Sequence, residues 1–241
     1  MIVTGDAIEE IRKLPDQSVD LVFTDPPYGE TSLCWDNKVG SWQYECLRVL
    51  KPSGSMWVFG SLRSHLEDRD LYRGWRVAQD VIWEKHNGSG ASADRFRRVH
   101  EILVQYYPCA AKWRDVYKSP VYSLDAAARS VRRKQKPQQW GDMGPSSYAT
   151  EDGGKRLLRS VLCVRSCHGS AVHPTQKPLD LLKPIIQYSC PVGGVVLDPF
   201  GGSGSISLAA LQLERKTVYV ERNAGYVEIA KQRLQDFLDL P

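Results

Sequence analysis

The first hundred residues alternate between short apolar runs and stretches in which apolar residues recur at helical spacing. The run from Val19 to Thr24 is typical of a buried strand, whereas Ile8, Ile11 and Leu14 share one helical face. The pattern predicts strands at 2–4, 19–24, 55–59, 77–83 and 102–107, and helices around 8–14, 42–50 and 62–72. No helical pattern separates the last two strands, so we expect them to form an antiparallel hairpin at the edge of a sheet.

The periodicity fails between Pro108 and His173, where Lys, Arg, Gln, Ser and Gly are frequent. It then returns, with predicted helices at 179–188, 205–213 and 226–238 and predicted strands at 195–197 and 217–220. This alternation indicates an α/β fold with a doubly wound, mostly parallel sheet that binds ligands at the carboxyl ends of its strands. We expect one domain made of residues 1–107 and 172–241, interrupted by an insertion at 108–171.

The composition is that of a globular protein. Of the 241 residues, 42% are hydrophobic and 25% are charged, and no apolar stretch approaches the roughly 18 residues that a membrane span needs. The first residues lack the basic start and apolar core of a secretory signal, so we expect a cytoplasmic protein that makes no membrane contact. The six cysteines are scattered, and we expect them to be reduced thiols.

The net charge of +4 is unevenly distributed along the chain. Residues 112–165 hold twelve Lys and Arg against five Asp and Glu, so this segment is basic and the remainder is acidic. A basic segment beside an acidic remainder indicates a surface that faces a polyanion, although a charged run is often only a solvated face. The candidates for phosphate contacts are Arg132, Arg133, Lys134 and Lys136.

A glycine-rich turn follows the predicted strand at 195–197 and leads into a helix. Its candidate ligand-binding residues are Asp198, Phe200, Gly201, Gly202 and Gly204. Glycines let a ligand approach the backbone closely, although such turns also occur without ligands. Glu221 lies nineteen residues after Gly202, at the end of the next predicted strand, where a carboxylate can accept both hydroxyls of a ribose. This spacing favours a nucleoside ligand, and the absence of a Gly-x-x-x-x-Gly-Lys pattern argues against a triphosphate.

The sequence Asp-Pro-Pro-Tyr at 25–28 follows the predicted strand at 19–24. Consecutive prolines can serve only to end a strand. The rigid turn also places a carboxylate, a backbone carbonyl and an aromatic face in one region. Two acceptors there could take both protons of an amine conjugated to a heteroaromatic ring, whose nitrogen is otherwise a poor nucleophile. A third cluster, His-Pro-Thr-Gln-Lys-Pro at 173–178, reads either as a helix cap or as a binding segment.

Together these three segments resemble the exocyclic-amino DNA methyltransferases that use S-adenosylmethionine. Asp-Pro-Pro-Tyr matches the catalytic motif of that family, and Asp-Pro-Phe-x-Gly-x-Gly at 198–204 matches its methionine-binding motif. The segment at 173–178 is similar to one that precedes the methionine-binding motif in a subgroup. Because the catalytic motif comes first and the cofactor motif last, the chain resembles the permuted β group. The resemblance implies a permuted Rossmann-like methyltransferase fold, with target recognition by the insertion at 108–171.

The resemblance also implies a role for each matching residue. Asp25 and the carbonyl of Pro26 would accept hydrogen bonds from the target amine beside Pro27, and Tyr28 would stack on a base flipped out of duplex DNA. Lys177 and Thr175 would reach the methionine carboxylate of the cofactor, and Asp6 resembles the position that reads its adenine. The residues implied in binding S-adenosylmethionine are Asp6, Asp198, Phe200, Gly201, Gly202, Gly204, Glu221, His173, Thr175 and Lys177.

We therefore expect methylation of adenine N6 in double-stranded DNA. Cytosine N4 methylation is the nearest alternative, although Asp at the first catalytic position resembles the adenine enzymes. Methylation of RNA or of a protein glutamine, a nucleotide-dependent dehydrogenase and a silent DNA-binding module remain further alternatives. We expect no metal, because Cys163, Cys167 and His168 lack a second ligand pair. The segment from Arg95 to Arg98 reads equally as a phosphate contact or a solvated loop. A homodimer is left open, and a restriction endonuclease partner is not identified.

Overall fold

The structure, a computed structural model, describes residues 1–33, 35–89, 93–133, 146–167, 169 and 171–239. The chain forms two compact units, one of Met1–Ser119 with Ser160–Pro241 and one of Pro120–Arg159. No helix in these described ranges is long and apolar enough to cross a membrane.

The larger unit contains an eight-stranded sheet and the helices that cover it. Its strands are β1 (Ile2–Thr4), β2 (Val19–Thr24), β3 (Leu50–Gly60), β4 (Trp75–Ser89), β5 (Arg98–Pro108), β10 (Val161–Cys163), β11 (Val195–Asp198) and β12 (Lys216–Glu221). Its helices are α1 (Ala7–Arg12), α2 (Trp42–Val49), α3 (Leu62–Glu67), α4 (Leu179–Ser189), α5 (Ser205–Gln212) and α6 (Ala224–Leu238), with short 3-10 turns η1 (Arg69–Tyr72) and η2 (Trp113–Asp115).

The strand order is β1-β12-β11-β2-β3-β5-β4-β10. The five strands from β1 to β3 are mutually parallel, and β5 runs antiparallel to both β3 and β4. This arrangement confirms the predicted doubly wound, mostly parallel fold and its antiparallel hairpin. One feature differs from the prediction, because β10 pairs in parallel with β4 and extends the sheet beyond the hairpin. Its three residues are too few to show a sequence period.

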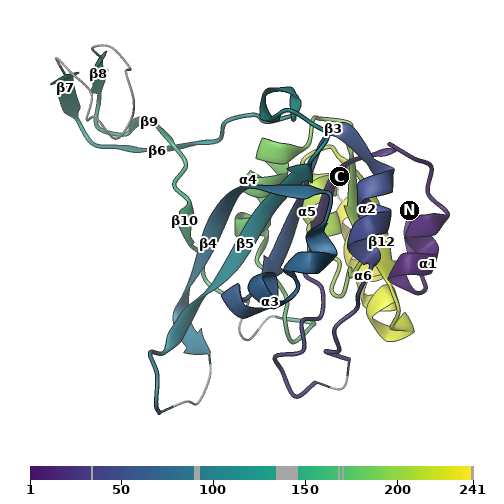
Figure 1. Cartoon of the computed structure of the whole chain (residues 1–241). Coiled ribbons are helices and arrows are strands. Elements are labelled where there is room, and N and C mark those ends of the chain that lie inside the picture. The colour runs from purple at the N-terminus through teal and green to yellow at the C-terminus, as the bar shows by residue number, and fades with distance from the viewer. Residues whose placement is uncertain (34, 90–92, 134–145, 168, 170, 240–241) are drawn as a thin grey trace. The chain divides into compact units, whose positions relative to one another are not determined.

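Helices lie on both faces of the central strands (Figure 1). Val22 and Met56 pack in a buried cluster with Trp42 of α2 and Ile11 of α1. On the other face, α5 packs against both α4 and α6. Trp57 donates its indole N–H to the hydroxyl of Ser189 at the end of α4, with 2.7 Å between the two atoms. The core thus lies on both sides of the sheet and fixes the positions of the strand ends.

The carboxyl ends of β11 and β2 lie side by side at the topological switch point of the sheet, where the connections from two neighbouring strands lead in opposite directions. From β11 the chain passes through α5 to β12 on one side, and from β2 it passes through α2 to β3 on the other. In open α/β sheets, ligands bind in the crevice at such a point, because the two connections leave it uncovered. Asp198 ends β11 and Asp25 follows β2, so the fold brings these two carboxylates to the same place.

The smaller unit consists of two short antiparallel pairs, β6 (Tyr122–Ala126) with β9 (Gly154–Leu157) and β7 (Arg129–Arg133) with β8 (Ser146–Thr150). It is shorter than the insertion expected at 108–171. Residues flanking it belong to the larger unit, because Tyr117 donates its backbone N–H to Ser53, Ser119 donates to Tyr188, and β10 joins the sheet.

Candidate functional site

The loop after β11 is shaped by close contacts at its glycines. Asp198 is 1% exposed, and its Oδ1 accepts a hydrogen bond from the backbone N–H of Phe200 at 3.3 Å. A Cβ on Gly201 would lie 2.1 Å from the ring of Tyr219, so no other residue fits there. Gly204 precedes α5 with a φ of +72°, a conformation that side chains rarely adopt. These constraints hold the loop open above the sheet.

Glu221, the last residue of β12, connects this loop to the start of α6. Its Oε2 accepts a hydrogen bond from the backbone N–H of Gly202 at 2.9 Å, and its Oε1 accepts one from Asn223 at 2.7 Å. Each carboxylate oxygen can accept a further hydrogen bond. Glu221 is therefore positioned by the backbone and retains acceptor capacity for a ligand.

A cavity of about 610 Å³, which we call the glycine-loop cavity, lies at these strand ends. It is lined by Asp6, Asp25, Pro27, Trp35, His173, Thr175, Lys177, Asp198, Phe200, Gly201, Gly202, Glu221, Asn223 and Tyr226, with further neighbours. Nearly all residues predicted to bind a cofactor are thus brought together. Gly204 does not line the cavity but packs under the loop, where a Cβ would lie 2.9 Å from Ala230.

The polar residues of this cavity already have structural partners. Asp6 is the N-cap of α1, and its Oδ1 accepts from the backbone N–H of Ile8 at 3.0 Å. Nδ1 of His173 lies 3.2 Å from the hydroxyl of Thr175, and the His173 ring packs edge-on against Tyr226. Burial lowers the pKa of His173 to about 4, so this ring is neutral. His173 therefore shapes the wall of the cavity and adds no charge to it.

A second, larger cavity of about 1080 Å³ lies beside the hairpin of β4 and β5, and we call it the hairpin cavity. Tyr28 lines it, together with residues of the hairpin and of the segment around Ser166.

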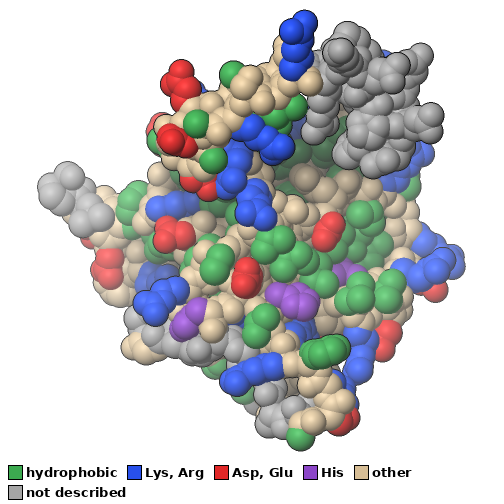
Figure 2. Space-filling view, turned by 90° about the vertical axis from the view of Figure 1, so that its left-hand side faces the viewer, with side chains coloured by type: hydrophobic (Ala, Val, Ile, Leu, Met, Phe, Trp, Pro, Cys, Tyr) green, Lys and Arg blue, Asp and Glu red, His purple; other side chains and the backbone are tan. Residues whose placement is uncertain are grey.

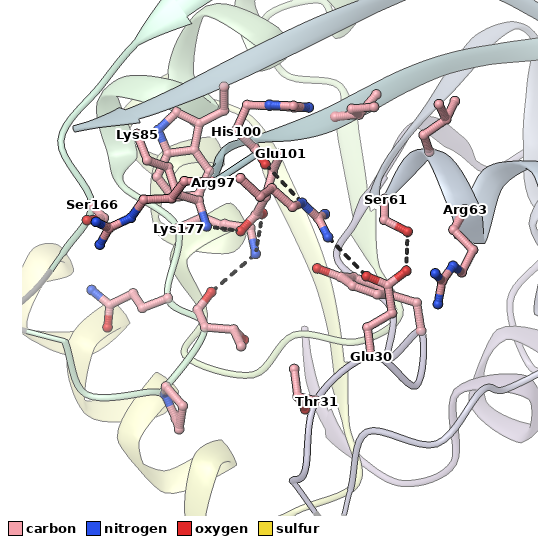
Figure 3. Close-up of a pocket in the computed structure, with 18 of the residues that line it drawn as sticks. Glu30, Thr31, Ser61, Arg63, Lys85, Arg97, His100, Glu101, Ser166 and Lys177 are labelled. Atoms are coloured by element: carbon pink, nitrogen blue, oxygen red, sulfur yellow. Dashed lines mark hydrogen bonds and ion pairs between the residues drawn. The ribbon is translucent and has the colours of Figure 1, made fainter. Parts of the chain in front are cut away.

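Figure 2 shows a face of the molecule on which Lys and Arg side chains lie at several separate places among acidic, apolar and His side chains. Glu30 accepts a hydrogen bond from Ser61 (Figure 3). It also accepts one from Arg98 of the hairpin, whose Nη1 lies 3.1 Å from Oε2 of Glu30.

Lys177 lines both cavities, and its ion pair with Asp25 lies where they meet. Its ammonium donates to Oδ2 of Asp25, the first residue of the Asp-Pro-Pro-Tyr segment. Oδ1 of Asp25 is buried without a hydrogen-bond partner among the described residues. A buried acceptor without a donor costs free energy, so such an atom is typical of a site that a ligand completes. Pro26 is buried, and Pro27 lines the glycine-loop cavity.

The ion pair continues into a chain of alternating charges (Figure 3). Nζ of Lys177 lies 3.4 Å from Oε2 of Glu101 on β5, and Lys85 on β4 donates to the other oxygen of Glu101. Lys177 also donates to the carbonyl of Thr175 at 3.3 Å. The ammonium thus makes two hydrogen bonds, to Asp25 and to Thr175, and a further ion pair with Glu101.

Burial and the neighbouring charges set the protonation of this chain. Burial alone would lower the pKa of Lys177, but the carboxylates of Asp25 and Glu101 raise it, so the ammonium stays charged. Burial raises the pKa of Asp25, and the Lys177 ammonium opposes that rise. Burial also raises the pKa of Asp198 to about 8, with a further contribution from the Asp25 charge. Near neutral pH, the protonated form of Asp198 is therefore favoured.

The predicted phosphate contacts lie in the smaller unit or outside the described residues. Arg132 is exposed on β7, opposite Ser147 of β8, and Arg133 ends the same strand. Lys134 and Lys136 lie outside the described residues. Tyr106 on β5 is 5% exposed and stacks on Tyr72 with 4.4 Å between ring centroids, so it is a packing residue.

The sequence did not predict the two hairpin residues of the charge chain. It also did not predict the hydrogen bonds that Glu30, on the loop after Tyr28, accepts from Ser61 and Arg98. Glu101 and Lys85 flank the apolar strands predicted at 102–107 and 77–83, and a charged residue beside a buried strand was the available signal. Glu30 and Ser61 gave no signal, because their contact depends on how two separate loops meet.

Comparisons with known proteins show which family the chain resembles in sequence. The family model described as DNA methylase, for N6 and N4 methyltransferases, matches residues 19–232. The chain is 29% identical to the type II methyltransferase M.HinfI of Haemophilus influenzae, over all of this chain and 69% of the relative. It is 29% identical to the DNA adenine methyltransferase YhdJ of Escherichia coli K12, over 97% of this chain and 82% of the relative.

Solved structures show the same fold. The complex of M1.HpyAVI with SAM superposes with a TM-score of 0.67 at 27% identity, covering 97% of this chain and 99% of that one. The cytosine-N4-specific PvuII DNA methyltransferase superposes with a TM-score of 0.67 at 17% identity, covering 96% and 85%, which supports the fold alone. By the family model that spans most of its length, the chain belongs to the N6/N4 DNA methylases.

Proposed function

We propose that this chain transfers a methyl group from S-adenosylmethionine to N6 of adenine in duplex DNA. The observation that carries the proposal is Oδ1 of Asp25, a buried acceptor without a donor among the described residues. Asp25 lines the glycine-loop cavity, and its partner Lys177 lines that cavity and the hairpin cavity alike. An acceptor at this junction can take a hydrogen bond from an amine that enters from one cavity toward a methyl donor in the other.

The residues of the glycine-loop cavity fit S-adenosylmethionine chemically. The raised pKa of Asp198 means that a cation bound there would favour its ionised form. Glu221 retains acceptor capacity for ribose hydroxyls. Gly201 and Gly202 line the cavity beside both carboxylates, and Trp35 and Tyr226 supply apolar surface for a purine. A cavity of about 610 Å³ is in the range of cofactor sites.

When bound, S-adenosylmethionine supplies an electrophilic methyl group on a sulfonium. We assign Glu221 to the ribose, Asp198 and Phe200 to the methionine part, and Asp6 to the adenine end. We assign Lys177 to positioning Asp25 and not to the cofactor carboxylate, because its ammonium already contacts Asp25, Glu101 and Thr175. Thr175 keeps its place in the wall of the cavity.

The remaining chemistry is positioning of the target amine. Lys177 holds Oδ2 of Asp25, so Oδ1 would accept a hydrogen bond from one N–H of the amine, and the carbonyl of Pro26 would accept one from the other N–H. As the new N–C bond forms and the bond from sulfur to the methyl carbon breaks, the nitrogen becomes acidic and loses one proton through the Asp25 carboxylate to solvent. Accepting both N–H groups draws the nitrogen lone pair out of conjugation and toward the methyl donor. Tyr28 provides a face for the flipped base. The rate then comes from orientation and preorganised charge, with no covalent intermediate on the protein.

The choice of adenine over cytosine N4 rests on two observations. The relative YhdJ is named as a DNA adenine methyltransferase. Asp25 opens the catalytic segment, as in the adenine enzymes that the sequence resembles. The likeness to the cytosine-N4 enzyme is in fold only. Duplex DNA would also contact the basic smaller unit, through Arg132 and Arg133.

We expect Asp25→Ala to lower the methylation rate by about 10² or more, because one preorganised polar group is removed from the reacting amine. Cofactor affinity should change much less. Transfer of tritiated methyl groups to unmethylated DNA measures the rate, and calorimetry measures the affinity. Asp16→Ala, which removes an exposed carboxylate outside both cavities, is the matched control. Undiminished turnover in Asp25→Ala would refute the mechanism.

Mass spectrometry of nucleosides from the treated DNA tests the adenine assignment in the same experiment. N6-methyladenine is the expected product. N4-methylcytosine as the only product would contradict the adenine assignment and leave the mechanism standing.

Glu221→Ala should weaken S-adenosylmethionine binding by roughly 10- to 100-fold, because hydrogen bonds to a charged acceptor are lost. Calorimetric titration measures the change, and circular dichroism checks that the variant is folded, since Glu221 also accepts two backbone hydrogen bonds. Glu228→Ala on α6, whose carboxylate pairs only with Lys231 among the described residues, should bind normally. Equal affinity of the folded Glu221→Ala variant and wild type would remove the ribose assignment.

Replacing Arg132 and Arg133 by Ala should reduce the slope of log affinity against log salt by about 1 to 2, because each phosphate contact releases about one counterion. Fluorescence anisotropy with labelled duplex at several salt concentrations gives the slope. The paired variant Arg12→Ala with Lys13→Ala, on α1, removes two cations that line neither cavity and is the control. An unchanged slope in the first variant would show that this run is only a solvated face.

A further inference from the structure

Near the tip of the hairpin formed by β4 and β5, an aromatic side chain is left unpacked. Phe96 is 101% exposed, the highest value among the exposed large apolar side chains of the described residues. It also lines the hairpin cavity, so it stands at the mouth of that cavity. Single exposed apolar residues are common on proteins. A fully exposed ring beside the cavity that contains Tyr28 nevertheless indicates a partner, because the ring is not buried against any of the described residues.

Arginines surround this ring on the same rim. Arg95 makes a two-pronged pair with Asp94, at 2.9 and 2.8 Å, and the side chain of Arg97 is exposed. Arg63 on α3 lines the cavity from the opposite side (Figure 3). Arg63 and Arg97 have no carboxylate partner in the part of the chain that the structure describes. Unpaired guanidinium groups around an apolar tip fit an anionic, stacked ligand, because they can contact its phosphates while the ring contacts its bases.

The hairpin is also fastened to the loop that holds Tyr28. Arg98, at the start of β5, pairs with Glu30 at 3.1 Å, and Glu30 accepts a hydrogen bond from Ser61. Glu30 lies two residues after Tyr28. A side chain near the hairpin tip therefore keeps a defined position relative to Tyr28, which is needed if one group fills the duplex while another holds the base.

A flipped base leaves a gap in the stack of the duplex. Extrusion loses the stacking and pairing of that base, and a side chain that enters the gap restores contacts for its former neighbours. An aromatic ring suits this place, because it stacks on any base. We propose that Phe96 enters the duplex at the target base pair and fills the space of the extruded base, while Arg63 and Arg97 contact the adjacent phosphates. This inference rests on the proposed function.

The test compares two duplexes that differ only opposite the target base. Sequencing of DNA methylated by the wild type gives the target sequence for both. In the first duplex the target adenine is paired with thymine, and in the second it faces an abasic site. Extrusion of the adenine needs less free energy in the second duplex, because no base pair has to be broken. Phe96→Ala should lower kcat/KM on the paired duplex by roughly 10-fold or more, the scale of one base–aromatic stack. On the abasic duplex the loss should fall to about twofold or less.

Three further variants distinguish a ring that enters the duplex, which we call a wedge, from a ring that only contacts the DNA surface. Phe96→Trp should retain activity on the paired duplex, because it keeps a flat stacking surface. Phe96→Lys should lose activity there although it adds a cation. Leu66→Ala, which removes an exposed apolar side chain on α3 that does not line the cavity, should behave as wild type. Fluorescence of 2-aminopurine at the target position reports extrusion directly, and it should rise less with Phe96→Ala than with wild type.

The possible outcomes distinguish this inference from the proposed function. Methylation by the wild type together with equal activity of Phe96→Ala on the paired duplex would overturn the wedge and leave the function intact. An equal loss on both duplexes would also overturn it, because the ring would then be only a contact. Absence of methylation by the wild type on any DNA would overturn the proposed function itself.

Discussion

The ion pair between Lys177 and Asp25 is the interaction on which the site depends. The two residues are 152 positions apart, one after β2 and the other before α4, and the fold buries their charged groups together. A buried charge is stable only with its partner, and loss of one partner leaves the other uncompensated. The pair therefore fixes the segment at 173–178 against the Asp-Pro-Pro-Tyr segment, and it does so where the two cavities meet.

This contact follows from the order of the strands rather than from the order of the chain. Parallel pairing of β11 with β2 places Asp198 and Asp25 at the same edge of the sheet, and β12 adds Glu221 beside them. The antiparallel hairpin then brings Glu101 and Lys85 to Lys177 from the other side. Acids and bases alternate along this chain of contacts, so each charge has an opposite neighbour. Oδ1 of Asp25 and Oε2 of Glu101 are the acceptors of this chain that have no hydrogen-bond donor among the described residues, and of the two residues it is Asp25 that lines the glycine-loop cavity.

The sequence predicted the parts of the site that depend on strand ends. Asp25, Asp198 and Glu221 each follow or end a periodic apolar run, and the carboxyl ends of parallel strands coincide in space. The partner of Lys177 could not be predicted, because the segment at 173–178 has no period and its contacts depend on tertiary packing. Strand β10 was not predicted for a similar reason, since a three-residue strand shows no alternation and is stabilised by pairing with β4.

The central claim is that Lys177 acts through Asp25, and a double-mutant cycle tests it most directly. The methylation rate and the cofactor affinity are measured for wild type, Asp25→Asn, Lys177→Met and the double variant. If Lys177 holds the carboxylate in place, each single change lowers kcat, and the double variant is about as slow as Asp25→Asn alone, with cofactor affinity little changed. Losses in kcat that multiply, or a drop in cofactor affinity with Lys177→Met in both backgrounds, would contradict the account.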